Sequence, residues 1–247
     1  MKRFYREAET APAAGGIAIL LDGRPVKTPA RNPLVVPTDE LGAAIAAEWN
    51  GQGEEIDPRF MPLTGLANAA IDRVAPDPAA FARILAAYGE NDLLCYRSEG
   101  PHALVRRQEE SWDPLLAWAR QRYDVDFETA RGVIHRPQPP KTVDRLAGAV
   151  AARDPFGLAS LSPLVTISGS LVIALALAEG AIGPDEAWAA ATLDEAWQAE
   201  RWGADVLAAQ ALAARRRDFD AACLFLTLLQ AAAPHPPARR RPGGNAA

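Results

Sequence analysis

The sequence predicts an α+β protein in which a small N-terminal β-containing domain, an α/β two-layer unit, precedes a larger and mainly helical domain. Three observations lead to this prediction. Short apolar runs separated by glycine and proline fill the first part of the chain, and alanine-rich stretches with helical spacing fill most of the rest. Two prolines in residues 75–78 mark the boundary between them. We therefore expect domains at residues 1–75 and 76–231, followed by a disordered Pro/Arg tail at residues 232–247.

The N-terminal domain is predicted to begin with a small β-meander. Residues 17–21 form a short apolar run, and Asp22-Gly23 separates it from a second run at residues 26–28. Aspartate and glycine tolerate the positive φ that a tight hairpin turn requires. Prolines then flank a third extended piece at residues 34–36. These signals predict three short strands.

Helices complete the N-terminal domain. Thr38 is a plausible N-cap, and Leu41, Ile45 and Trp49 recur every four residues along one helical face. Glycines end that helix, and a second helix is expected near residues 63–74.

The second domain is predicted to be almost entirely helical. Asp77 is placed to cap a helix that has Pro78 at its first position. A long helix at residues 101–123 is expected to be interrupted at Pro114, because proline removes a backbone donor and clashes with the preceding turn. Residues 93–97 form a short strand or a helical turn. Further helices are expected near residues 141–152, 155–178, 184–203 and 205–231.

Composition argues against several functional classes. The formal charge is −5, whereas nucleic-acid binders usually carry a basic balance. The two cysteines, Cys95 and Cys223, offer no disulfide framework and suit a reducing compartment. The most apolar stretch, residues 171–178, is far shorter than the roughly 20 residues that a membrane span needs. No apolar targeting segment follows the first charges, so we expect a cytoplasmic protein that binds neither nucleic acid nor membrane.

The sequence also lacks the usual signatures of an enzyme. There is no Gly-rich phosphate loop, and none of the three histidines has a partner at metal-ligand spacing. We therefore expect no cofactor, no metal and no catalytic residue. One enzyme alternative remains open, because residue spacing does not decide it. It is a polar site that folding would assemble from Asp92, Arg97, Glu109 and His135.

Residues 184–203 carry the most informative pattern. On one continuous helix, side chains seven positions apart share a face. A helix with large apolar groups on two faces is either packed all round or offers one face to a partner, and both interpretations are open. One face holds Trp188, Glu195 and Trp202, the opposite face holds Leu193 and Trp197, and Asp194 and Gln198 lie beside the Trp202 stripe.

Taken together, several segments resemble one protein family over residues 3–230. The sequence is similar to the assembly chaperones of F1-type ATP synthase, which hold the free α subunit before it joins β. The motifs that carry this resemblance, in chain order, are residues 20–29, Glu48-Trp49, residues 52–58, residues 61–64 with Asn68, residues 92–97, residues 112–116, residues 193–198 and Trp202-Gly203.

The resemblance implies a function without catalysis. Family members bind the unassembled α subunit and prevent its aggregation until the β subunit displaces them. The resemblance also implies a small β-containing unit followed by a helical one. The chain looks like the bacterial, cytoplasmic form, whereas organellar relatives act in the mitochondrial matrix. We expect a monomer, and a general holdase for many unfolded clients is a further alternative.

A chaperone of this kind needs apolar anchors for affinity and charged groups that set orientation and association rate. We expect the client to contact the acidic edge of the 184–203 segment, at Asp194, Glu195, Gln198 and Trp202. Trp49 is a further candidate, although its apolar neighbours on the same helical face favour a role in the core.

Overall fold

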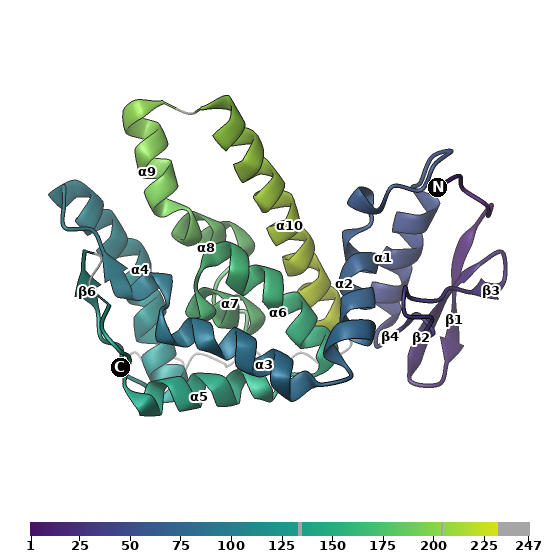
Figure 1. The fold of residues 1–247 in the computed structure, drawn as a ribbon, viewed down its shortest axis with the longest axis horizontal. Helices are drawn as coiled ribbons and strands as arrows, with labels where there is room; N and C mark the ends of the chain where they lie inside the picture. The colour runs from purple at the N-terminus through teal and green to yellow at the C-terminus, as the bar shows by residue number, and fades with distance from the viewer. Residues whose placement is uncertain (133–134, 204, 232–247) are drawn as a thin grey trace, which may run out of the picture.

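A computed structural model describes residues 1–132, 135–203 and 205–231. A small sheet and two helices lie at one end of the long axis, and a mostly helical body makes up the rest (Figure 1). This arrangement confirms the predicted α+β class. The predicted tail at residues 232–247 lies outside the described residues.

The sheet is built around one central strand. Strand β2 (Gly16–Leu21) pairs antiparallel with β1 (Ala8–Ala13), β3 (Arg24–Pro25) and β4 (Val35–Val36). The Asp22-Gly23 turn has φ values of +48° and +75°, which confirms the predicted hairpin. Its second strand, β3, lies earlier than residues 26–28. Strand β1, with the sequence AETAPA, was not predicted, because it lacks an alternation of large apolar and polar residues.

The outer edge of β1 is protected against further strand pairing. The side chain of Asn50 hydrogen-bonds to both backbone groups of Ala8. The N–H of Ala8 donates to Asn50 Oδ1 at 2.7 Å, and Asn50 Nδ2 donates to the carbonyl of Ala8 at 2.8 Å. Backbone groups of alternate residues point to the same edge, so Pro12 also faces outward, and it has no N–H to offer. Both features block the pairing that exposed edges invite.

One helix covers the sheet, and a second packs against the first. Helix α1 (Asp39–Asn50) begins as predicted at Thr38, whose side chain accepts the N–H of Leu41. A short 3₁₀ turn (Pro58–Phe60) leads to α2 (Pro62–Ala69), which continues as a π-helical segment (Ala70–Val74). The core between these elements buries Ile19, Leu34, Val36, Leu41, Ile45, Leu63, Ala67 and Phe225.

The helical body surrounds one fully buried helix. All residues of α7 (Leu171–Ala178) are buried, as expected for a helix that is apolar on every face. The other helices are α3 (Pro78–Ala86), α4 (His102–Tyr123), α5 (Pro140–Ala151), α6 (Pro155–Ser168), α8 (Pro184–Ala191), α9 (Leu193–Trp202) and α10 (Val206–Gln230). Two 3₁₀ turns, Ala87–Glu90 and Leu93–Cys95, precede β5 (Tyr96–Arg97), which pairs in parallel with β6 (Ala130–Arg131).

Three predicted helix boundaries in this body are wrong. Helix α4 runs through Pro114 without a break, because the carbonyl that loses its donor belongs to Glu110, which is exposed to water. The predicted helix at residues 155–178 is divided at Gly169, which has a φ of +67°, and Ser170 caps the new helix. The predicted helix at residues 184–203 is divided at Thr192.

Helix α10 joins the two parts of the molecule. Its residue Phe225 is fully buried in the N-terminal core and stacks on Phe156 with ring centroids 6.4 Å apart. The hydroxyl of Thr38 donates to the carbonyl of Leu228 at 2.9 Å. The domain boundary at residue 75 stays a prediction, and α10 contributes to both cores.

Candidate functional site

Helix α9 stands at the end of the molecule away from the sheet, between α4 and α10 (Figure 1). Trp197 is buried, whereas Trp202 is 79% exposed. The helix therefore buries one face and presents another. Concavities lie on both sides of it, one towards α4 and one towards α10.

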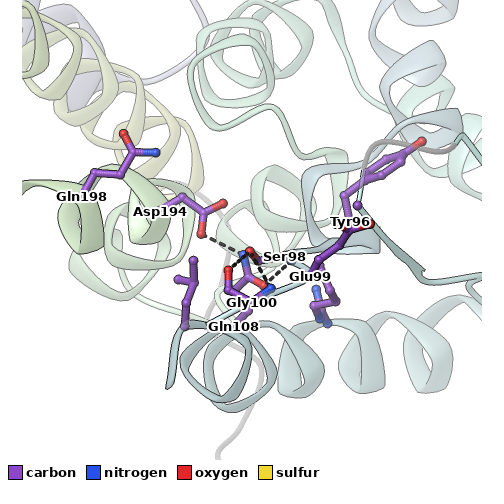
Figure 2. A pocket seen from close by; sticks show the side chains of 10 residues that line it. Tyr96, Ser98, Glu99, Gly100, Gln108, Asp194 and Gln198 are labelled. Carbon is purple, nitrogen blue, oxygen red and sulfur yellow. Dashed lines mark hydrogen bonds between the residues drawn. The ribbon is translucent and has the colours of Figure 1, made fainter. Parts of the chain in front are cut away.

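The first concavity, of about 530 Å³, lies between α9 and the loop that follows β5. Helix α9 contributes Asp194 and Gln198, and the loop contributes the carboxylate of Glu99 (Figure 2). Other lining residues are Tyr96, Arg97, Ser98, Gly100, Leu104, Gln108 and Gly132. Carboxylates at its mouth make it suited to a basic group.

Gln108 of α4 organises this first concavity. Its Nε2 donates to Asp194 Oδ1 at 2.8 Å, and its Oε1 accepts the N–H of Ser98 at 2.8 Å (Figure 2). Gln108 is only 1% exposed, so its ends of both bonds lie away from water. Sequence reasoning missed Gln108, since a single glutamine within a charged helical stretch carries no distinguishing signal.

The second concavity is a groove of about 500 Å³ between α9 and α10, which we call the α9–α10 groove. Glu195 of α9 and Arg215 of α10 pair across it at 2.7 Å. Gln198 lines both concavities and so forms the ridge between them. Besides these residues, the groove is lined by Ala199, Trp202, Gly203, Asp205, Ala208, Ala209, Ala211 and Leu212.

The contacts that hold α9 against α4 are largely polar. The guanidinium groups of Arg107 and Arg201 each lie 4.8 Å from the ring centroid of Trp197. Arg107 also pairs with Glu200 at 2.8 Å, and this hydrogen bond holds the pKa of Glu200 below its ordinary value. Both members of that pair are about half exposed, so the pair itself contributes little stability.

The break at Thr192 corrects the predicted face of residues 184–203. Trp188 is on α8, where it packs edge-on against Phe219 with ring centroids 5.4 Å apart. It therefore does not form a stripe with Glu195 and Trp202, which are on α9. Glu195, Trp202, Asp194 and Gln198 do come together on α9.

Trp49 lies elsewhere. It belongs to α1, near the sheet and at the other end of the molecule from α9 (Figure 1). Its ring is half-buried and lies 5.6 Å from that of Tyr5, and it packs against both apolar clusters of the N-terminal region. The fold thus does not bring Trp49 to the α9 residues.

The residues of the alternative polar site each have a separate structural partner. Asp92 is fully buried and accepts the N–H groups of Leu94 and Val172, and burial raises the pKa of its carboxyl. Arg97 donates to the carbonyl of Leu94 and pairs with Asp113. Elsewhere, the Nδ1 of His135 lies 3.1 Å from the hydroxyl of Tyr96, and Glu109 is 3.9 Å from Arg131.

Within the described ranges, no group of three or more His, Cys, Asp and Glu side chains could hold a metal ion. Among the helices described, none is both long and apolar enough to cross a membrane. Cys95 and Cys223 are free and buried, and burial raises the pKa of both thiols to about 12.

Comparisons with known proteins agree with one another. The family model of the ATP12 chaperone protein matches residues 2–120. The mitochondrial protein atp12 of Schizosaccharomyces pombe is 24% identical over 214 residues, which cover 82% of this chain and 74% of that protein. The crystal structure of Atp12 from Paracoccus denitrificans matches with a TM-score of 0.88 and 44% identity, covering 92% of this chain and 98% of that one.

A second crystal structure, of the Atu1473 protein from Agrobacterium tumefaciens, matches with a TM-score of 0.89 and 42% identity. It covers 92% of this chain and 86% of that chain. Proteins can share a fold at much lower sequence identity. An identity above 40% over nearly the whole of a solved relative therefore indicates a common family as well as a common fold. The chain therefore belongs to the ATP12 family of ATP synthase assembly chaperones, as its motifs predicted.

Proposed function

We propose that this protein binds the unassembled α subunit of F1 and prevents its aggregation until the β subunit takes its place. The observation that carries the proposal is the exposed indole of Trp202 on α9, which lines the same groove as Glu195, with the carboxylate of Asp194 in the concavity on the other side of the helix. It is supported by membership of a family of assembly chaperones. We further propose that the protein works as a cytoplasmic monomer and without catalysis.

The physical task of such a chaperone favours a mixed surface of this kind. An aromatic anchor supplies affinity, because it removes a large apolar area from water at a low cost in conformational entropy. Carboxylates around the anchor speed association with a basic client and fix its orientation. The chaperone must later yield to the β subunit, so a surface of moderate apolar area suits the task better than a large one.

The proposed contact residues are Asp194, Glu195, Gln198 and Trp202. Trp49 stays a second candidate, at the opposite end of the molecule. A client large enough to reach both ends would be needed to contact it together with α9 (Figure 1).

The test is co-expression of this chain with the α subunit from the same organism. We expect α to become soluble and to co-elute with the chaperone as a one-to-one complex that added β subunit dissociates. Trp202→Ala should weaken this complex, whereas Phe60→Ala, which removes another aromatic ring that is 72% exposed, should not. Aggregation of α with and without the chaperone would overturn the proposal. Equal protection of unrelated unfolded proteins would indicate a general holdase instead.

A further inference from the structure

Four alanines line the α9–α10 groove. Ala199 comes from α9, and Ala208, Ala209 and Ala211 come from α10. Packed helices approach to about 8–10 Å between axes, and small side chains at the contact favour the closer end of that range. The groove can therefore admit another backbone element between α9 and α10.

The groove contains one large exposed apolar side chain. Trp202, at the end of α9, lines the groove and is 79% exposed. Val206 and Leu207, at the start of α10, are also exposed but do not line the groove. An exposed aromatic side chain in a groove is typical of an interaction site, and a partner would cover it.

The charges around the groove favour a basic occupant. Glu99 and Asp194 lie on one side of the Gln198 ridge, and Glu195 and Asp205 lie on the other. The two arginines of these concavities, Arg97 and Arg215, are already paired with Asp113 and Glu195. In the part of the chain that the structure describes, Asp205 has no cation within salt-bridge distance. The net charge of the site is thus negative.

The backbone of the groove favours a helix over a strand. The N–H and C=O groups of α9 and α10 bond within their own helices, so the groove has no strand edge to offer. An extended segment buried there would leave its own backbone groups unpaired, whereas a helix satisfies them internally. Helix-in-groove binding meets this requirement.

We propose that the α9–α10 groove binds an amphipathic α-helix of the client, with its apolar face on the alanines and Trp202 and with a basic residue near Asp205. This inference rests on the proposed chaperone function and names the part of the client that the same surface takes. The Gln198 ridge would let a second basic side chain of the client reach the Asp194 concavity.

The proposal can be tested by site-directed cross-linking with purified α subunit. Ala209→Cys places one thiol in the groove, where a maleimide photo-cross-linker can be attached. Cys95 and Cys223 are buried, and their raised pKa of about 12 leaves almost no thiolate at neutral pH, so labelling is selective. Ala152→Cys, at an exposed position after α5, is the matched control.

We expect cross-links from position 209 to fall in one segment of α, at positions three or four apart, with a Lys or Arg nearby. Cross-linked positions two residues apart in the α subunit would show that a strand occupies the groove and would overturn the helix assignment. Cross-links no more frequent than those from position 152, in a complex that does form, would overturn the proposal itself.

Two variants provide a second and independent measurement. Ala209→Trp fills the groove and should weaken the affinity for α at least tenfold. Ala213→Trp, at an exposed position on α10 outside the groove, should leave the affinity unchanged. Asp205→Asn preserves the N-cap acceptor for Ala208 but removes the charge, so it should weaken binding most at low salt.

These measurements separate failure of the inference from failure of the proposed function. If the unaltered chaperone does not bind α at all, the proposed function fails. If it binds α and both tryptophan variants bind equally well, only the groove assignment fails.

Discussion

Gln108 and Asp194 are 86 positions apart in the chain, and a 2.8 Å hydrogen bond between their side chains joins α4 to α9. The bond occupies one oxygen of the Asp194 carboxylate and fixes its orientation at the mouth of the first concavity. It also links α9 to the loop after β5, because the same glutamine accepts the N–H of Ser98. A surface that is fixed before the client arrives loses less entropy on binding.

Gln108→Leu should therefore destabilise the protein. Leucine fills a similar volume but leaves the Ser98 N–H and the buried side of Asp194 without a partner. We expect the free energy of unfolding to fall by about 1–3 kcal/mol. Urea denaturation followed by circular dichroism measures the change. Gln198→Leu, at an exposed position on α9, is the control and should change stability by less than about 0.5 kcal/mol. Equal effects of the two variants would contradict the bridging role of Gln108.

The carboxylate of Asp92 accepts hydrogen bonds at the start of two helical segments, the 3₁₀ turn Leu93–Cys95 and helix α7. It accepts the N–H of Leu94 at 3.0 Å and the N–H of Val172, in the first turn of α7, at 2.9 Å. Asp92→Ala would leave both donors buried and unpaired, and we expect a loss of about 3 kcal/mol. Asp154→Ala, which removes an exposed N-cap from α6, should cost only about 1 kcal/mol. Differential scanning calorimetry of the two variants checks this ranking, and a reversed order would refute it.

Local signals predicted several elements correctly. The Asp22-Gly23 turn joins two neighbouring strands, and the caps Thr38 and Asp77 each accept an N–H from a residue three positions further on, so a short window of sequence contains these signals. The start of α7 is different. Part of its capping comes from Asp92, 80 positions earlier in the chain, and no local pattern records that bond.

The same distinction applies to the candidate site. Helical spacing separated Trp197 from Trp202, and the structure buries the first and exposes the second. Trp188 was misplaced because the break at Thr192 turns α8 away from α9, and residue spacing assumes a continuous helix. The Gln108–Asp194 bond depends on how α4 packs against α9, which periodicity does not encode.

Glu48 should make stability depend on pH. Its carboxylate accepts the N–H groups of Leu63 and Thr64 at the start of α2, and burial, which outweighs these bonds, raises its pKa. The folded protein then holds this proton more tightly than the unfolded chain, whose glutamates have a pKa of about 4.3. The Glu48 contribution to stability is thus largest below that pH and decreases as pH rises through the folded pKa.

Glu48→Gln removes this titration. The wild-type free energy of unfolding minus that of the variant should therefore fall as pH rises from about 4 until the folded pKa is passed, and then level off. Urea unfolding at a series of pH values measures the difference. A difference that grows with pH would mean that the hydrogen bonds outweigh burial.

Gly16 is required by a close approach between strands. Its φ is +146°, and a Cβ at this position would lie 2.1 Å from the carbonyl oxygen of Val36. Gly16→Ala should push β4 away from β2 and cost more than about 2 kcal/mol. Gly53→Ala, where a Cβ would have open space, should stay within about 0.5 kcal/mol of the wild type. Thermal unfolding of both variants tests the contrast, and a Gly16→Ala protein as stable as the wild type would contradict it.

Removing charge from α9 should weaken client binding without loss of stability. Asp194→Asn keeps an oxygen that can accept from Gln108, and the Glu195–Arg215 pair is exposed enough to contribute little to folding. We therefore expect Asp194→Asn and Glu195→Gln each to slow association with the α subunit several-fold at low salt, with little change at high salt. Stopped-flow association and a melting temperature for each variant measure the two effects.

Charge reversal is the less informative change at Asp194, because a lysine there would also break the bond to Gln108. Asp185→Asn serves as the control, since it removes an exposed carboxylate from the neighbouring helix α8. It should leave association unchanged. If Asp194→Asn and Glu195→Gln bind the α subunit as fast as Asp185→Asn does, or if their melting temperatures fall together with their affinities, the acidic edge of α9 has a structural role and the client binds elsewhere.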